Sequence, residues 1–225
     1  QQVDAFTARA GEQWTSKTIN QEELKTLLPS VCLKATSGKD NPIGNYLSMA
    51  QGISFDKLLM DFDTSPDEGI NGEAYLYNIM TDSLTIDTLG LDLKHGPDGL
   101  DFFAGVISTP KPEQEAFEID LDGTVGNGKA QMLLQYLNAK KEKGIYLGLD
   151  AALGRRGIRM KFFPENPTLV YRPFKLNERN YIYLADRGRI YGNVHLFDEQ
   201  GTGIQFYTNR EDTIADQEMT VELSR

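Results

Sequence analysis

Apolar and polar side chains alternate along most of the chain after residue 53. The clearest run places Ile145, Leu147 and Leu149 on one side of an extended segment, and a period of two is the period of a β-strand. Turn sequences rich in glycine, such as residues 154–157, separate one run from the next. We therefore expect about ten strands joined by hairpins, and hence a mainly β fold built on an antiparallel sheet.

The first 52 residues carry helical signals instead. Asn20 precedes Glu23 by three positions, which resembles the spacing of a capping box. Asn41 is followed by Pro42, and Gly52 closes the same stretch, as expected for a helix with an N-cap, a proline in its first turn and a glycine at its end. We therefore divide the chain into a short helical N-terminal segment, residues 1–52, and a β-rich segment with an apolar groove, residues 53–225.

A sheet with one apolar face must cover that face with something. A second sheet would do so in a sandwich, whereas one long sheet could curl until its apolar face lines a groove. Glycine in mid-strand at Gly148 and Gly192, and the small residues Ala151 and Ala152, favour a strongly twisted, curled sheet. The pattern alone leaves both arrangements open.

Charge and composition argue against several classes of function. The formal net charge of -10 and a pI near 4.7 disfavour a nucleic-acid-binding surface, because phosphate binding requires clustered lysine and arginine. No apolar run reaches the length of about 18 residues that a membrane-spanning helix needs. Cys32 is the single cysteine, so an internal disulfide and a cysteine-based zinc cluster are excluded. The chain opens Gln-Gln-Val-Asp without a signal peptide, and we interpret it as a piece of a longer protein.

No group of residues points to catalysis. The two histidines, His95 and His195, have no paired metal ligands in the sequence, and there is no Gly-x-Ser-x-Gly motif. Carboxylates are abundant, and two of them suffice for a glycosidase. Most of these carboxylates alternate with apolar residues, as on the solvated side of a half-buried sheet; they are Asp61, Asp63, Asp87, Asp92, Asp120 and Asp122. We expect a protein that is not an enzyme and has neither cofactor nor metal site. A carbohydrate-binding or carbohydrate-active β-sandwich remains the alternative.

Several short motifs resemble one family of envelope proteins. They are PENPTLVYRPFKLN at residues 164–177, NYIYLAD at residues 180–186, Gly201-Thr202-Gly203, Asn41-Pro42 with Tyr46-Leu47, and Asp63-Thr64-Ser65-Pro66 after Phe55-Asp56. This set resembles the Bacteroidetes branch of the TamB translocation and assembly module family, within the AsmA-like superfamily. The likeness extends from about residue 41 to the C-terminus, and its motifs are not catalytic signatures.

The resemblance implies both an architecture and a role. Members of this family are long periplasmic proteins anchored at the inner membrane, and they are built as a β-taco, an extended curled antiparallel sheet with an apolar interior. They are implicated in phospholipid transport between the inner and outer membranes and in outer-membrane assembly with a barrel partner. The implied ligands and partners are therefore phospholipid acyl chains and an outer-membrane barrel assembly protein of the TamA or BamA type. The family offers no catalytic residues to carry over, and the helical N-terminal segment departs from its uninterrupted groove.

We therefore expect one segment of a lipid-conducting bridge, located in the periplasm with its anchor outside this chain. A repeated apolar face can keep acyl chains dry, since exposing each CH₂ group to water costs about 0.8 kcal/mol. The lipid-groove lining predicted from strand phase consists of Ile145, Leu147, Leu149, Ile158, Met160, Phe162, Ile190, Val194, Leu196, Ile204 and Phe206. A scaffold that assembles outer-membrane proteins by strand addition is a further alternative.

Overall fold

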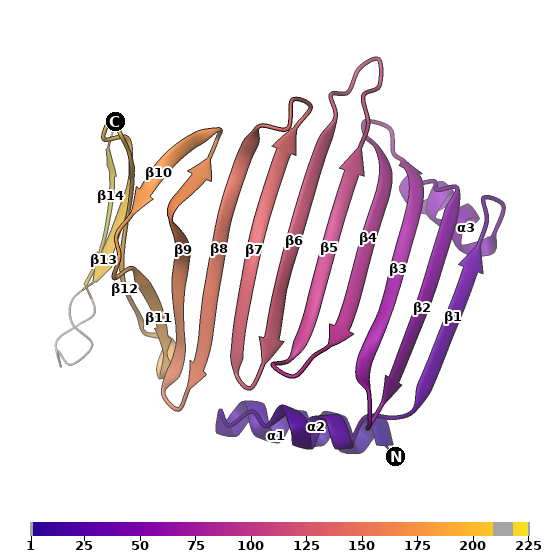
Figure 1. Cartoon of the computed structure of the whole chain (residues 1–225), viewed down its shortest axis with the longest axis horizontal. Helices are drawn as coiled ribbons and strands as arrows, with labels where there is room; N and C mark the ends of the chain where they lie inside the picture. The colour runs from indigo at the N-terminus through magenta and orange to yellow at the C-terminus, as the bar shows by residue number, and fades with distance from the viewer. Residues whose placement is uncertain (1, 209–217, 225) are drawn as a thin grey trace.

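The fold is dominated by one large antiparallel sheet. The computed structural model describes residues 2–208 and 218–224, and within them 14 strands form a single sheet (Figure 1). The strands are β1 (Val31–Ser37), β2 (Lys57–Ser65), β3 (Gly69–Met80), β4 (Thr85–His95), β5 (Leu100–Ser108), β6 (Phe117–Gly126), β7 (Lys129–Asn138), β8 (Lys143–Gly154), β9 (Gly157–Leu169), β10 (Arg172–Leu176), β11 (Tyr181–Ala185), β12 (Ile190–Asp198), β13 (Gly203–Thr208) and β14 (Met219–Ser224). The mainly β, antiparallel prediction is confirmed, and consecutive strands are neighbours almost throughout.

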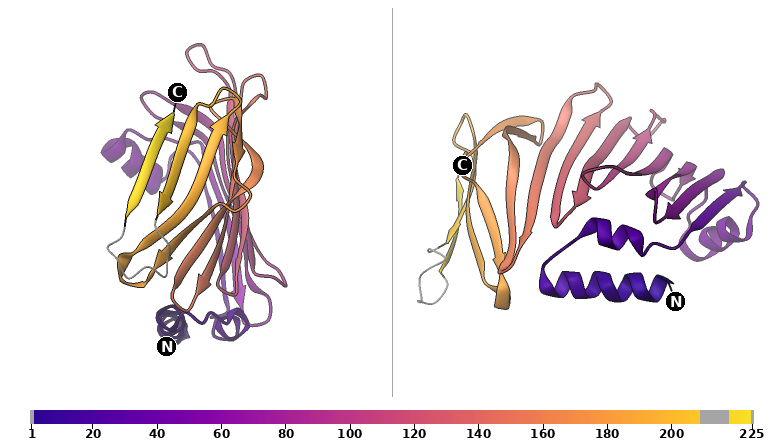
Figure 2. Two further views of the ribbon diagram at one scale, coloured as in Figure 1. Left: turned by 90° about the vertical axis from the view of Figure 1, so that its left-hand side faces the viewer. Right: turned by 60° about the horizontal axis from the view of Figure 1, so that its bottom comes forward.

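No second sheet packs on this one in the described part of the chain, so the sandwich alternative is wrong. The strands twist progressively, and β12–β14 are turned out of the plane of β2–β8 (Figure 2). Such twist is the intrinsic preference of extended L-amino-acid chains. The sheet is therefore a single layer whose two faces must be considered separately.

Three helices precede or interrupt the first strands. They are α1 (Gln2–Ser16), α2 (Gln21–Thr26) and α3 (Pro42–Gln51). Both expected N-caps begin a helix: the side chain of Asn20 accepts a hydrogen bond from the backbone of Glu23, and that of Asn41 accepts one from Gly44. None of the helices in the described residues combines the length and apolar character needed to cross a membrane.

The strand β1 lies inside the segment that we expected to be helical. It pairs with β2 over its whole length, from Val31 opposite Thr64 to Ser37 opposite Leu58. Its apolar positions alternate, but the run is too short and too interrupted by polar residues to stand out beside the flanking helix caps. The sheet therefore begins before residue 52.

The strand between β9 and β12 is broken into two pieces, β10 and β11, which both pair with β9 and with β12. Two asparagines bridge the gap. Asn180 is 4% exposed; its side chain accepts from the Phe162 backbone N–H at 2.7 Å and donates to the Phe162 carbonyl at 3.1 Å. On the other side, Asn177 accepts from the backbone N–H of His195 at 2.9 Å. Because these amides replace backbone partners, the sheet continues across the break.

Candidate functional site

Strand register assembles apolar side chains into rows that cross the sheet. We call the side that carries Ile145, Leu147 and Leu149 the apolar face, and the opposite side the polar face. The first row runs Leu33, Phe62, Gly72, Leu93, Phe102, Gly123, Met132, Leu149 and Phe162. The second row runs Ala35, Met60, Ala74, Leu91, Ala104, Leu121, Leu134 and Leu147. The third row runs Ser37, Leu58, Leu76, Leu89, Val106, Ile119, Tyr136, Ile145 and Leu169.

None of the side chains in these three rows is buried. The buried apolar residues of the described chain lie elsewhere and are few: Leu28, Phe55, Ile79, Leu176 and Tyr191. The accessible surface of the chain is 14714 Å², whereas a compact monomer of 25.2 kDa exposes about 10,300 Å². The excess belongs to a single-layer sheet, and its apolar face is open to a ligand or partner.

Aromatic rings lie over glycines of the neighbouring strand in these rows. A Cβ atom built on Gly72 would lie against the ring of Phe62, and one built on Gly123 would come within 2.9 Å of Cζ of Phe102. The glycine leaves room for the ring to lie flat on the sheet, a pairing that also stabilises glycine within a strand. At these two positions the rings fill the space above the glycines, so the apolar surface of the first row continues across them.

All of the lining residues predicted from strand phase fall on the apolar face. Leu149 pairs with Phe162, Val194 pairs with Phe206 and Leu196 pairs with Ile204. The two halves of the set are connected through β11, in which Ile182 pairs with both Met160 and Gly192, and Leu184 pairs with both Ile158 and Ile190. The role of these residues as a lipid lining stays a prediction.

The sequence reasoning missed the larger part of the face, from β1 to β7. Leu93 and Phe102 face each other in its centre, but their separate runs gave no sign of which strands would be neighbours. The alternation of Phe117, Ile119 and Leu121 was the available signal. The strand register is needed to show which of these alternating residues lie next to one another on neighbouring strands.

The helices α1 and α2, with their connecting residues 17–20, form a strap that crosses the ends of strands β3–β8 (Figures 1 and 2). Within the strap, the carboxylate of Glu23 accepts from Arg9 at 2.6 Å and from Gln13 at 3.0 Å. The Arg9 guanidinium holds the pKa of Glu23 below its ordinary value. These contacts fasten the two helices to each other.

The strap is attached to the sheet at several points. Just after α2, the carbonyl of Pro29 accepts a hydrogen bond from the hydroxyl of Thr64 on β2 at 2.6 Å. The Gln21 backbone N–H donates to the side chain of Asn127 at 3.3 Å, between β6 and β7. At the far end, Lys17 forms an ion pair with Asp186, which follows β11. The strap therefore covers the apolar face at one end of strands β3–β8 and is attached to the sheet on both sides of them.

A cavity of 470 Å³ lies between the strap and the apolar face. Phe6, Trp14 and Leu24 line it from the strap, and Leu100, Val125, Ala151 and Leu153 line it from the sheet. Trp14 is 61% exposed, and its indole borders the cavity. His95 and Gln21 are among the polar residues of the lining.

The polar face holds most of the carboxylates considered above, and several of them have partners. Asp61 forms an ion pair with Lys34 at 2.7 Å. Asp87 is the exception, because it shares the strand phase of Leu89 near the start of β4; its ion pair with Lys111, 2.8 Å long, keeps the pKa of Asp87 below its ordinary value. The hydrogen bond from Tyr75 to Asp92, 2.8 Å long, raises the pKa of Tyr75 to about 12. These contacts support the reading of the carboxylates as the solvated side of the sheet.

Asp120 differs from these carboxylates because burial raises its pKa above the ordinary value, and the nearby Glu118 carboxylate acts in the same direction. A raised pKa is also a feature of general acids. In the sheet register, however, Asp120 lies between Gly105 and Gln135, and its acidic neighbour Glu118 is itself in an ion pair with Lys141. We therefore assign it no catalytic role.

Cys32, Asp61 and Asp63 bring one potential ligand atom each within 4.8 Å of one another. The hydrogen bond to Asp63 raises the pKa of the Cys32 thiol, which favours the protonated form rather than the thiolate that binds metals. Of the histidines, His195 lies on the polar face beside Gln205, whereas His95 ends β4 on the apolar face opposite Leu100.

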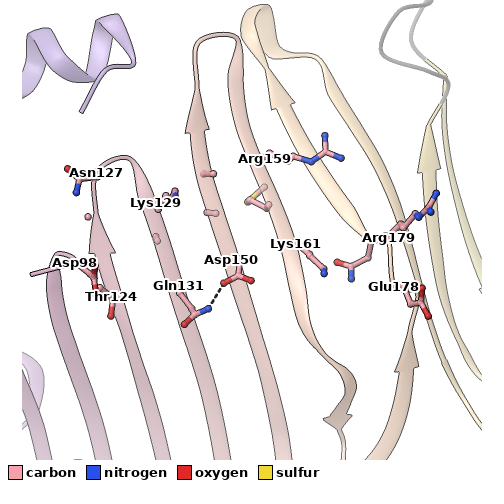
Figure 3. A pocket seen from close by; sticks show the side chains of 16 residues that line it. Asp98, Thr124, Asn127, Lys129, Gln131, Asp150, Arg159, Lys161, Glu178 and Arg179 are labelled. Carbon is pink, nitrogen blue, oxygen red and sulfur yellow. Dashed lines mark hydrogen bonds between the residues drawn. The ribbon is translucent and has the colours of Figure 1, made fainter. Parts of the chain in front are cut away.

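A second, polar hollow of 820 Å³ contains charged groups of both signs. Gln131, Asp150 and Lys161 form one cross-strand row there, and Lys129 and Arg159 flank Ala152 in the next. Figure 3 shows Glu178 and Arg179 approaching from the connection after β10. Gln131 donates to Asp150 at 2.7 Å, and the Arg159 guanidinium lies 4.2 Å from the ring centroid of Tyr181. Opposite charges are mixed throughout, so the hollow selects neither anions nor cations clearly.

Comparisons with protein-family models, with curated proteins and with solved structures found no match for this chain. The resemblance to the TamB family therefore stays a prediction, and the functional argument depends on the two faces of the sheet.

Proposed function

We propose that this chain is one segment of a lipid-conducting bridge, whose apolar face shields phospholipid acyl chains from water during transport between two membranes. The observation that carries the proposal is the set of three apolar rows. They cross eight or nine neighbouring strands without a charged residue, and none of their side chains is buried. A sheet whose apolar face served only as a closed core would bury these rows.

The energetics favour a lipid occupant. Each CH₂ group taken out of water contributes about 0.8 kcal/mol, so an acyl chain gains free energy from contact with any part of the face. The rows offer similar apolar surfaces at successive positions, so a chain could move along them without leaving one deep site. This requires apolar residues at alternate strand positions and no specific constellation.

The family resemblance supplies the wider context of the proposal. In that context the sheet curls like a taco, the helical N-terminal segment lies along one lip, and the parent protein is anchored at the inner membrane and crosses the periplasm. Its partner at the outer membrane would be a barrel assembly protein of the TamA or BamA type. The twist of the sheet and the mid-strand glycines support a curl.

A matched pair of leucines tests the proposal. Leu134 lies on the apolar face opposite Leu147, and Leu133, its neighbour in sequence, lies on the polar face opposite Gly148. A photo-reactive phenylalanine analogue would replace each leucine in turn, and the purified, irradiated chain would be analysed by mass spectrometry for covalently attached phospholipid. We expect adducts at position 134 and not at position 133.

Equal labelling at both positions, or labelling at neither in folded protein, would contradict the lipid track. Protein-to-protein adducts at position 134 in place of lipid would instead identify a polypeptide as the occupant of the apolar face. Circular dichroism of both variants confirms that the sheet is intact.

Strand addition is the second candidate function. Within the described residues, β1 and β14 are the two ends of the sheet, and along β14 Met219, Val221 and Leu223 are 58%, 61% and 80% exposed. An edge strand with exposed apolar side chains can accept a further strand. Protein adducts from a photo-reactive residue at Val221, in the absence of lipid adducts at Leu134, would favour this candidate.

A further inference from the structure

The cavity under the strap differs from the rest of the apolar face because it contains buried polar atoms. Oε1 of Gln21 and Nδ1 of His95 are both buried and have no hydrogen-bond partner within the described residues. Their side chains meet only weakly, with 3.5 Å between Nε2 of Gln21 and Nε2 of His95. Burying such groups without partners costs roughly 1–3 kcal/mol each, so a ligand that supplies the partners would be bound selectively.

The size and lining of the cavity limit the ligand. At about 30 Å³ per small group, the share of liquid volume that a water molecule takes, the volume of 470 Å³ holds roughly 16 groups of methylene size. That matches a single acyl chain of about this length, so a two-chain lipid would leave its second chain outside the cavity. The lining is apolar except at a few residues, which include Lys25 and Lys129 as well as Gln21 and His95.

We propose that the strap and the sheet together form a binding site for a single-chain anionic amphiphile with a free hydroxyl group, the chemistry of a lysophospholipid. The chain would fill the space between Trp14, Leu100 and Leu153. The hydroxyl would donate to Oε1 of Gln21, the phosphate would accept a hydrogen bond from Nδ1 of His95, and Lys25 would place a positive charge beside the phosphate. The site rests on the proposed function in that its ligand would reach it from the apolar face.

Trp14 provides a direct readout because it is the only tryptophan of the chain and lines the cavity. Titration of the 225-residue chain with palmitoyl lysophosphatidate carrying bromine on its acyl chain, kept below its micelle concentration, should quench Trp14 fluorescence saturably. Two-chain brominated phosphatidate should quench at least about tenfold less well at equal concentration, since its second chain would stay outside the cavity.

Matched variants separate the cavity from the open face. Ala151→Phe fills the cavity from β8 and should weaken quenching about tenfold or more. Ala104→Phe makes the same change in the second row, outside the cavity lining, and should leave quenching unchanged. Gln21→Leu removes the polar acceptor while keeping the size of the side chain. It should weaken lysophosphatidate binding about fivefold and leave brominated palmitate, which lacks the hydroxyl, little changed.

The outcomes distinguish this site from the lipid track. Phospholipid adducts at Leu134 without saturable Trp14 quenching would overturn the site and leave the track standing. Saturable quenching that Ala151→Phe abolishes, without adducts at Leu134, would support the site and refute the track. Equal quenching by one-chain and two-chain lipids, or equal effects of Ala151→Phe and Ala104→Phe, would reduce the binding to non-specific contact with the apolar face and overturn the site.

Discussion

Replacing Leu89 with aspartate tests whether the apolar face is open. Leu89 lies in the third row between Leu76 and Val106 and is 42% exposed. Full burial of a leucine contributes about 1.5–3 kcal/mol. Because little more than half of this residue is buried, Leu89→Asp should lower the free energy of unfolding by about 1–2 kcal/mol. The new carboxylate adds little, since solvent reaches the site.

The polar face offers a matched control. Ile107 is 46% exposed and faces Thr88 and Glu118, so Ile107→Asp should lower the free energy of unfolding by a similar amount. The two variants should differ in lipid binding alone: Leu89→Asp places a charge on the proposed track and should strongly reduce phospholipid adducts at Leu134, whereas Ile107→Asp should leave them unchanged.

Equilibrium urea unfolding at two protein concentrations measures these stabilities. A loss above about 3 kcal/mol for Leu89→Asp, the range of closed-core substitutions, would refute the reasoning, because it would show that Leu89 is covered in solution. An unfolding midpoint that rises with protein concentration would show that a second copy of the chain covers the face.

Three further predictions concern the fold and its charges. Asn180→Leu leaves the backbone N–H and carbonyl of Phe162 without partners and should cost about 2–5 kcal/mol in urea unfolding; a loss below 1 kcal/mol would show that water replaces the amide. Asp87→Asn should destabilise the chain by about 1 kcal/mol at neutral pH. Because Lys111 lowers the pKa of Asp87, the stability that the Asp87 carboxylate contributes should disappear as pH falls through its folded-state pKa. A difference in unfolding free energy between the wild-type chain and Asp87→Asn that stays constant with pH would contradict this. Asp120→Asn should stabilise the chain at neutral pH, because a raised carboxyl pKa penalises the ionised form. Its advantage should vanish as pH falls below about 4, where both states are protonated.

The sequence predicted local structure well where a single residue sets the conformation. Asn20 and Asn41 cap helices because their side chains satisfy N–H groups three residues on, a contact that depends on spacing alone. The alternation of β8 and β9 likewise placed Leu149 and Phe162 on one face, because side chains point to opposite sides at every step along a strand.

The features that the sequence did not reveal depend on contacts between distant residues. The helix α1 has no predicted cap and little apolar character, and it is held by contacts such as Gln13 to Glu23. The strap cavity requires Trp14 and Leu153 to meet, although they are far apart in the chain. Asn180 gave no signal, because an asparagine that bridges a broken strand has the same local sequence as one in an ordinary turn.

The two parts of the apolar face suit different tasks, and the difference follows from their side chains. In the first row, aromatic rings lie over Gly72 and Gly123, and the row contains no polar side chain that would hold a lipid at one position. An acyl chain would therefore meet low barriers as it moves between neighbouring strands. Under the strap, Gln21 and His95 supply unsatisfied polar atoms, and leaving that position would break hydrogen bonds worth about 0.5–1.5 kcal/mol each. A face that conducts acyl chains must be uniform, whereas a site that holds one amphiphile must not be. Exchange of Gln21 for leucine would therefore convert the holding position into a continuation of the track, and this should speed release of lysophosphatidate without reducing phospholipid adducts at Leu134.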